Sequence, residues 1–208
     1  MTGCIWYIQA TCDPSTARGF MPVGRPGEDL KAYYQRLSIL AARIEKAEAI
    51  PVDELPTDYE SKKTDPKCNL NLPMWHSAFV HVHKDMAAVL RRYDIGQTVL
   101  APMRITMPDS VTVNTDYCLL AITTLKMTVD PDRSVPKAYG SNRWASPYSA
   151  SKVDTTLVAR PSTLEGPDIW TAPDVFSTIF VSDRLAQALL VAEWGSKLKL
   201  RKVRVADT

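Results

Sequence analysis

The chain shows two hydrophobic periods, a period of two that is typical of strands and a period of three to four that is typical of helices. Residues 3–10 (GCIWYIQA) are rich in β-branched and aromatic side chains and lead into a DPS turn cluster, which predicts a first strand. In residues 28–46, apolar side chains recur at spacings of three and four, which predicts a helix with one apolar face. Residues 53–73 are polar and punctuated by prolines, so we expect a connection without regular structure.

A repeated unit is the strongest internal pattern. Residues 79–105 can be aligned with residues 178–205, at a constant offset of 99 over 15 positions, four of which are identical. Each copy has a short β-like run, a segment with apolar residues at helical spacing, a glycine and another β-like run. Helices are therefore expected at approximately 84–94 and 183–193. Because each would be only about three turns long, it needs a sheet to pack against.

The ends of these two helices also have signals. Ser182 followed by Asp183 is a plausible N-cap with an acid in the first turn, whereas His83 is a weaker cap in the first copy. Gly96 and Gly195 stand where a helix C-terminus favours a residue able to adopt positive φ, so we expect the helices to end there.

These elements together predict the fold class. Residues 111–129 contain β-like runs, of which LLAI is continuous enough for a buried central strand, and residues 153–160 read as another strand. We expect an α+β protein with a mixed, mainly antiparallel sheet covered by two pseudo-equivalent helices plus an N-terminal helix. A single domain over 1–208 is expected, with two pseudo-repeat halves at about 74–110 and 170–205.

Composition is that of an ordinary globular protein, with 208 residues, 45% hydrophobic and 23% charged side chains. Twenty-five Lys and Arg oppose 23 Asp and Glu, so the formal net charge of +2 gives too weak a field to make nucleic acid the expected partner. Basic residues do gather in KLKLRKVR (197–204), where they alternate with apolar ones. That period favours the solvent face of an edge strand over a phosphate-binding strip.

Cysteine usage and the N-terminus indicate a compartment. The chain lacks a CxxC pair, so neither a structural zinc site nor a redox motif is signalled, and no cofactor is expected. Residues 1–10 lack the charged start and apolar stretch of a secretory signal, and no apolar run approaches membrane-spanning length. We therefore expect a cytoplasmic protein with reduced thiols and no membrane partner. The four cysteines are Cys4, Cys12, Cys68 and Cys118.

The order of segments from residue 74 to residue 205 resembles a known family. An apolar strand leads into FVHVHKDMAAVLRRYDIG, followed by LAPMRI, DYCLLAITTLKMTVD, a long variable loop and DIWTAPDVFSTIFVSDRLAQALLVAEWGSKLKLRKV. This order, with short phrases such as IFVSDRLAQAL and RRYDIG, is similar to the bacterial polymorphic-toxin immunity proteins numbered eleven, formerly a domain of unknown function. The resemblance implies a cytoplasmic protein of interbacterial competition, encoded beside a secreted toxin, that binds the toxin and blocks it in the producing cell.

The resemblance supplies no catalytic residues. Immunity proteins are often acidic because many of their toxin targets are basic nucleases, whereas this chain is near neutral. The charge therefore argues against a nuclease as the cognate toxin.

Enzyme chemistry has little support in the sequence. No GxSxG, papain-like cysteine phrase, HExxH or phosphate-cradling glycine loop is present. His81 and His83 would share one face of a strand, as ligands in some hydrolase sites do, but Asp85 is the only nearby carboxylate. We therefore expect no catalytic residues and no metal site, and we keep a small metal-dependent hydrolase using His81 and His83 as the alternative.

A binding role is better supported. The loop 131–152 is rich in Pro, Gly, Ser and Asn, and loops of this length inside a compact domain are usually functional or disordered. Its Tyr139, Arg143, Trp144 and Tyr148 are residue types that dominate recognition surfaces, so we predict that they contact the toxin. An equally weighted interpretation is that these aromatic side chains cover the core. The cognate toxin's effector domain is the expected partner, and self-association stays open.

Overall fold

The computed structural model describes residues 3–9, 14–61, 70–134, 144, 157–175, 178–192 and 195–207. These residues form three α-helices and thirteen strands in antiparallel and mixed sheets, so the predicted α+β fold is confirmed. None of the described helices is long and apolar enough to cross a membrane. The helices are α1 (Leu30–Glu45), α2 (Lys84–Leu90) and α3 (Asp183–Val191).

The helix starts follow the sequence, whereas the ends of α2 and α3 do not. The side chain of Ser182 accepts a hydrogen bond from the Leu185 backbone N–H at 3.2 Å and caps α3, and His83 Nδ1 caps α2 over a longer 3.4 Å. The expectation that Gly96 and Gly195 end the helices is wrong, because α2 already ends at Leu90 and α3 at Val191. Gly96 has positive φ, but in the turn that follows α2.

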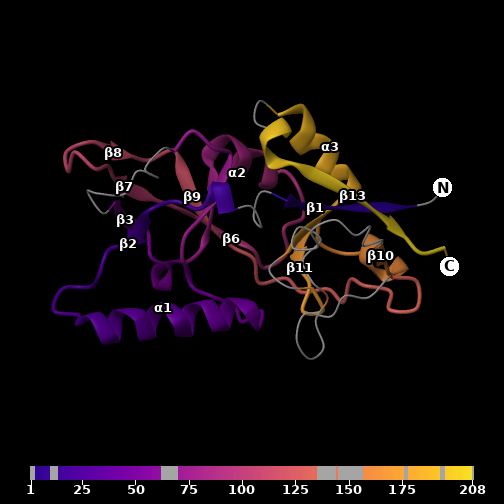
Figure 1. The fold of residues 1–208 in the computed structure, drawn as a ribbon, viewed down its shortest axis with the longest axis horizontal. Helices are drawn as coiled ribbons and strands as arrows, with labels where there is room; N and C mark the ends of the chain where they lie inside the picture. Colours follow the sequence, from indigo (N-terminus) through magenta and orange to yellow (C-terminus); the bar gives the residue numbers. More distant parts are fainter. Residues whose placement is uncertain are drawn as a thin grey trace.

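A five-stranded sheet contains both ends of the chain (Figure 1). Its order is β10 (Val158–Ala159), β13 (Leu200–Val205), β1 (Cys4–Ile8), β12 (Ile179–Ser182) and β11 (Ile169–Thr171). All neighbours are antiparallel except β10 and β13. The segment 197–204 was expected at a sheet edge, but β13 is the second strand, and β10 pairs only with its last two residues. Of the strand predicted over 153–160, residues 153–156 lie outside the described residues.

The second sheet is four-stranded and antiparallel. Its order is β4 (Met74–His76), β5 (Val80–His83), β9 (Tyr117–Ala121) and β6 (Val99–Pro102). Every residue of β9 is buried, as the continuous LLAI run predicted for a central strand.

A third sheet extends the second. Its order is β2 (Phe20–Pro22), β3 (Asp58–Ser61), β7 (Arg104–Thr106) and β8 (Val113–Asn114), with β3 and β7 parallel. Strand β3 contradicts the expectation that residues 53–73 lack regular structure. Its single aromatic side chain, Tyr59, is buried against the sheet while its neighbours are exposed, and this one anchor was too weak a pattern to recognise.

The first two sheets are built alike. The chain passes through β4, β5, α2 and β6 in the same order as through β11, β12, α3 and β13. The junction of β5 with α2 lies 99 residues before the junction of β12 with α3. In one sheet Val82 faces Cys118 of β9, and in the other Val181 faces Trp6 of β1. The N-terminal strand β1 therefore takes, in the C-terminal half, the place that β9 takes in the other half.

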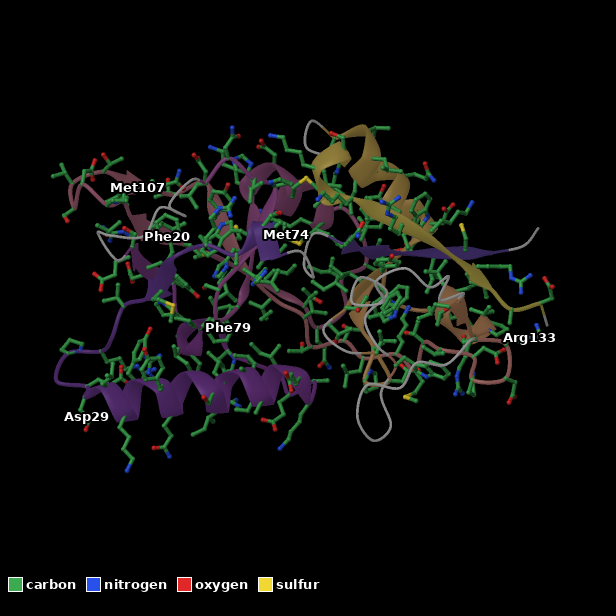
Figure 2. All side chains as sticks on the ribbon, viewed as in Figure 1. Phe20, Asp29, Met74, Phe79, Met107 and Arg133 are labelled. Atoms are coloured by element: carbon green, nitrogen blue, oxygen red, sulfur yellow. The ribbon has the colours of Figure 1, made fainter. Side chains whose placement is uncertain are left out.

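Three apolar clusters hold these layers together. Helices α2 and α3 contact each other and share one cluster with the first two sheets, on the side opposite α1 (Figure 1). Helix α1 contributes Tyr33, Leu37 and Leu40 to a second cluster, and Phe79 lies between α1 and the strands (Figure 2). The third cluster lies on the other face of the five-stranded sheet and contains Trp170.

Candidate functional site

The predicted toxin-binding residues lie mostly outside the part of the chain that the structure describes. Tyr139, Arg143 and Tyr148 are among the residues left out, as is most of the loop 131–152. Trp144 is half-buried, packs against the third apolar cluster, and donates its backbone N–H to the carbonyl oxygen of Asp174 at 2.8 Å. The role of these four residues in toxin binding stays a prediction.

The histidines of the hydrolase alternative lie in or beside the core. His81 is fully buried and stacks on Trp75 with ring centroids 3.8 Å apart, and burial lowers its pKa to about 3. His83 caps α2 and contacts Asp85. Within the described ranges, no group of three or more His, Cys, Asp or Glu side chains could hold a metal ion. Nothing in these surroundings supports a hydrolase, which stays an untested alternative.

A better candidate is the face where α3 begins. Asp168, immediately before β11, is a carboxylate that is only 1% exposed. It accepts hydrogen bonds from the Arg184 guanidinium at 2.6 and 2.8 Å, from the Ser182 hydroxyl, and from the Asp94 backbone N–H at 3.1 Å. Burial opposes ionisation of Asp168, but the hydrogen bonds from Arg184 and Ser182 outweigh it, so its pKa lies below the usual value. The carboxylate thus joins the start of α3 to the turn after α2.

A second carboxylate anchors β1 to the same helix. Asp183 accepts a hydrogen bond from the Trp6 indole N–H at 2.7 Å and another from the Cys4 thiol at 3.1 Å. These two bonds hold the pKa of Asp183 below its ordinary value. Burial and the neighbouring Asp183 carboxylate raise the pKa of the Cys4 thiol, which therefore stays protonated at neutral pH.

Lys126 completes the face. Its ammonium donates hydrogen bonds to the carbonyl oxygens of Glu165 and Pro167, both at 2.7 Å, and lies 3.9 Å from the centre of the Trp170 ring. Burial lowers the pKa of Lys126. A pocket of about 610 Å³ opens between these groups, and its lining includes Cys4, Lys126, Leu164, Asp168, Asp183 and Arg184.

Comparison with known proteins adds no identification. No protein-family model matches this chain, and no curated protein matches its sequence.

The side chains of this face are held in fixed positions by hydrogen bonds. Asp168 and Asp183 are ionised at neutral pH and already accept several hydrogen bonds, and the Cys4 thiol is not activated. Trp6 is held by Asp183 in the first turn of α3, and Arg184 is held by Asp168, which also accepts a hydrogen bond from the Ser182 hydroxyl. The arrangement therefore presents large side chains in defined orientations.

Only part of this face is predictable from the sequence. Ser182 and Asp183 were recognised as the start of a helix, but Asp168 and Arg184 were not recognised as a pair. They are 16 residues apart, and the antiparallel pairing of β11 with β12 brings them together. An acid directly before a strand, facing an arginine in the first turn of the next helix, is the signal that could have revealed the pair.

Proposed function

We propose that this chain is a cytoplasmic immunity protein that neutralises a cognate secreted bacterial toxin by stoichiometric binding. The order of segments over residues 74–205 supports this proposal through its resemblance to the immunity family numbered eleven. The structural observation that supports it is the anchored face at the start of α3. There Asp183 accepts one hydrogen bond from Trp6, and Asp168 accepts two from Arg184.

Anchoring favours tight binding for two reasons. Trp and Arg are the side chains that most often contribute large binding free energies at protein interfaces. Ordering a flexible side chain on binding costs about 0.5–1.5 kcal/mol, and a side chain already fixed in the free protein avoids most of that cost. A protein that must neutralise every toxin molecule in the cell benefits from both effects.

Co-expression with the toxin tests the proposal. The proposal places the toxin domain at the C-terminus of a secreted protein encoded beside this chain, and the test expresses that domain alone and together with the chain. We expect the chain to restore growth and to co-elute with the toxin domain in a fixed ratio. The double variant Trp6→Ala/Arg184→Ala should lose both effects, whereas Lys31→Ala/Lys46→Ala on the exposed surface of α1 should retain them. Restored growth without any complex would contradict stoichiometric inhibition and favour an enzyme that reverses the damage.

A further inference from the structure

Strand β13 carries two positive charges next to the anchored face, and neither forms an ion pair with a described residue. Lys202 and Arg204 are exposed and are two residues apart, so their side chains lie on the same face of the strand, about 7 Å from one another. Their partners across the sheet are Trp6 and Cys4, which contact Asp183 at the start of α3. Both cations therefore point to the α3 side of the sheet.

In the described part of the chain, these two cations lack the ion pairs that six other Lys and Arg side chains form. Arg36, Arg43 and Arg184 each lie within 4 Å of a carboxylate. Over the described residues, Lys202 and Arg204 have no carboxylate that close.

The strand opposite offers no acid either. Trp6 places its ring 5.8 Å from the Lys202 ammonium, and Arg204 faces the neutral Cys4 thiol. Asp183 lies near enough for Lys202 to contribute to its lowered pKa, and its carboxylate accepts hydrogen bonds from Trp6 and Cys4. Because both donors are neutral, Asp183 keeps its single negative charge, and the two positive charges of Lys202 and Arg204 exceed it by one.

We infer that Trp6, Lys202 and Arg204, here called the β13 patch, are the docking surface for an acidic surface of a partner protein. This inference rests on the proposed function and specifies the chemistry of the toxin surface: carboxylates that approach Lys202 and Arg204 around an apolar contact with the Trp6 ring. Like charges side by side on a strand reduce stability, and a partner that supplies carboxylates removes that repulsion on binding.

An acidic protein fits the β13 patch better than a nucleic acid does. Proteins that bind duplex DNA tightly neutralise about 6–10 phosphates, whereas this patch presents two cations beside a fixed aromatic ring. Complementary charge on a folded partner needs only a few pairs to steer association.

Charge reversal tests the β13 patch against the toxin domain. Lys202→Glu/Arg204→Glu is compared with Lys31→Glu/Lys46→Glu, which makes the same change in net charge on α1, away from β13 (Figure 1). We expect the first variant to associate at least about tenfold more slowly and to lose most of the salt dependence seen between about 0.05 and 0.5 M salt. The control should associate as the unaltered chain does. Equal association by both variants would overturn the inference and leave the immunity proposal standing.

A second measurement does not need the toxin. In a Cys12→Ser/Cys68→Ser chain, Cys4 is the accessible thiol, because Cys118 is buried. Poly-L-glutamate at low salt should slow alkylation of Cys4 at least about threefold, and Lys202→Glu/Arg204→Glu should abolish this protection. Protection without toxin binding would support the acidic docking surface while the immunity proposal fails. Absence of protection, or stronger protection by a DNA duplex at equal charge concentration, would overturn the inference.

Discussion

Replacement of His81 by Phe should change the acid stability of the protein more than its stability at neutral pH. The His81 ring is completely buried, stacked on Trp75 and edge-on to Tyr59, and neither ring nitrogen has a hydrogen-bond partner among the described residues. In the same part of the chain, the indole N–H of Trp75 and the hydroxyl of Tyr59 are also buried without partners. Phe preserves the stacking and removes two unpaired polar atoms.

The magnitude follows from proton linkage. Burial lowers the His81 pKa from an ordinary 6.5 to about 3, so between these values the unfolded chain binds a proton that the folded chain does not. The stability contributed by neutral His81 is complete above pH 6.5 and is lost as the pH falls toward 3. Within that window the free energy of unfolding falls by about 1.4 kcal/mol per pH unit, and by about 3 kcal/mol between pH 6.5 and pH 4. That loss is a large part of the ~5–15 kcal/mol typical of a folded protein.

The assay is urea unfolding followed by tryptophan fluorescence at several pH values from 7.5 to 4. At pH 7.5, we expect His81→Phe to unfold within about 1.5 kcal/mol of the unaltered chain, because the loss of unpaired polar atoms offsets the larger ring. Below pH 6, the free energy of unfolding of the unaltered chain should fall relative to that of the variant by about 1 kcal/mol per pH unit. Tyr59→Phe, which removes a hydroxyl that does not titrate in acid, should retain the original acid dependence. Parallel pH curves for His81→Phe and the unaltered chain would show that burial of His81 does not cause the acid dependence.

Three other substitutions test further contacts of the fold by the same unfolding assay. Asp168→Asn should lower the free energy of unfolding by about 2–3 kcal/mol, since the amide cannot accept all the hydrogen bonds of the carboxylate. A decrease below about 0.5 kcal/mol would contradict the anchoring role of Asp168. Gly96→Ala should lower the free energy of unfolding by at least about 1 kcal/mol more than Gly27→Ala. Both glycines have positive φ, but only at Gly96 would a Cβ lie 2.6 Å from Thr124 Oγ1. Equal decreases for the two variants would contradict this clash. Ser182→Ala should cost about 1–2 kcal/mol through loss of the α3 cap, and a neutral result would show that the cap is dispensable.

Local patterns were sufficient to predict most of the elements. The spacing of Tyr33, Leu37 and Leu40 identified α1, and those side chains are buried in the structure. The polar side chains of His83 and Ser182 predict the starts of α2 and α3, respectively, because N-capping depends on one side chain and the next three residues. These features were predictable since each depends on residues close in sequence.

Features that depend on distant residues were not predictable in the same way. No local pattern places β1 between β12 and β13, because that pairing joins residues far apart in sequence, such as Cys4 and Arg204. For the same reason the ion pair of Asp168 with Arg184, and the contact of Asp183 with Trp6, became visible only in the folded chain. Helix ends were misjudged because Gly96 serves a turn beyond α2.

Native mass spectrometry of the chain co-expressed with the toxin domain tests whether the chain inhibits the toxin by binding it. We expect a complex with a fixed ratio of subunits in which both polypeptides keep their unmodified masses, and loss of that complex with Trp6→Ala/Arg184→Ala. Restored growth with no complex, or a toxin that has been covalently altered, would contradict this expectation.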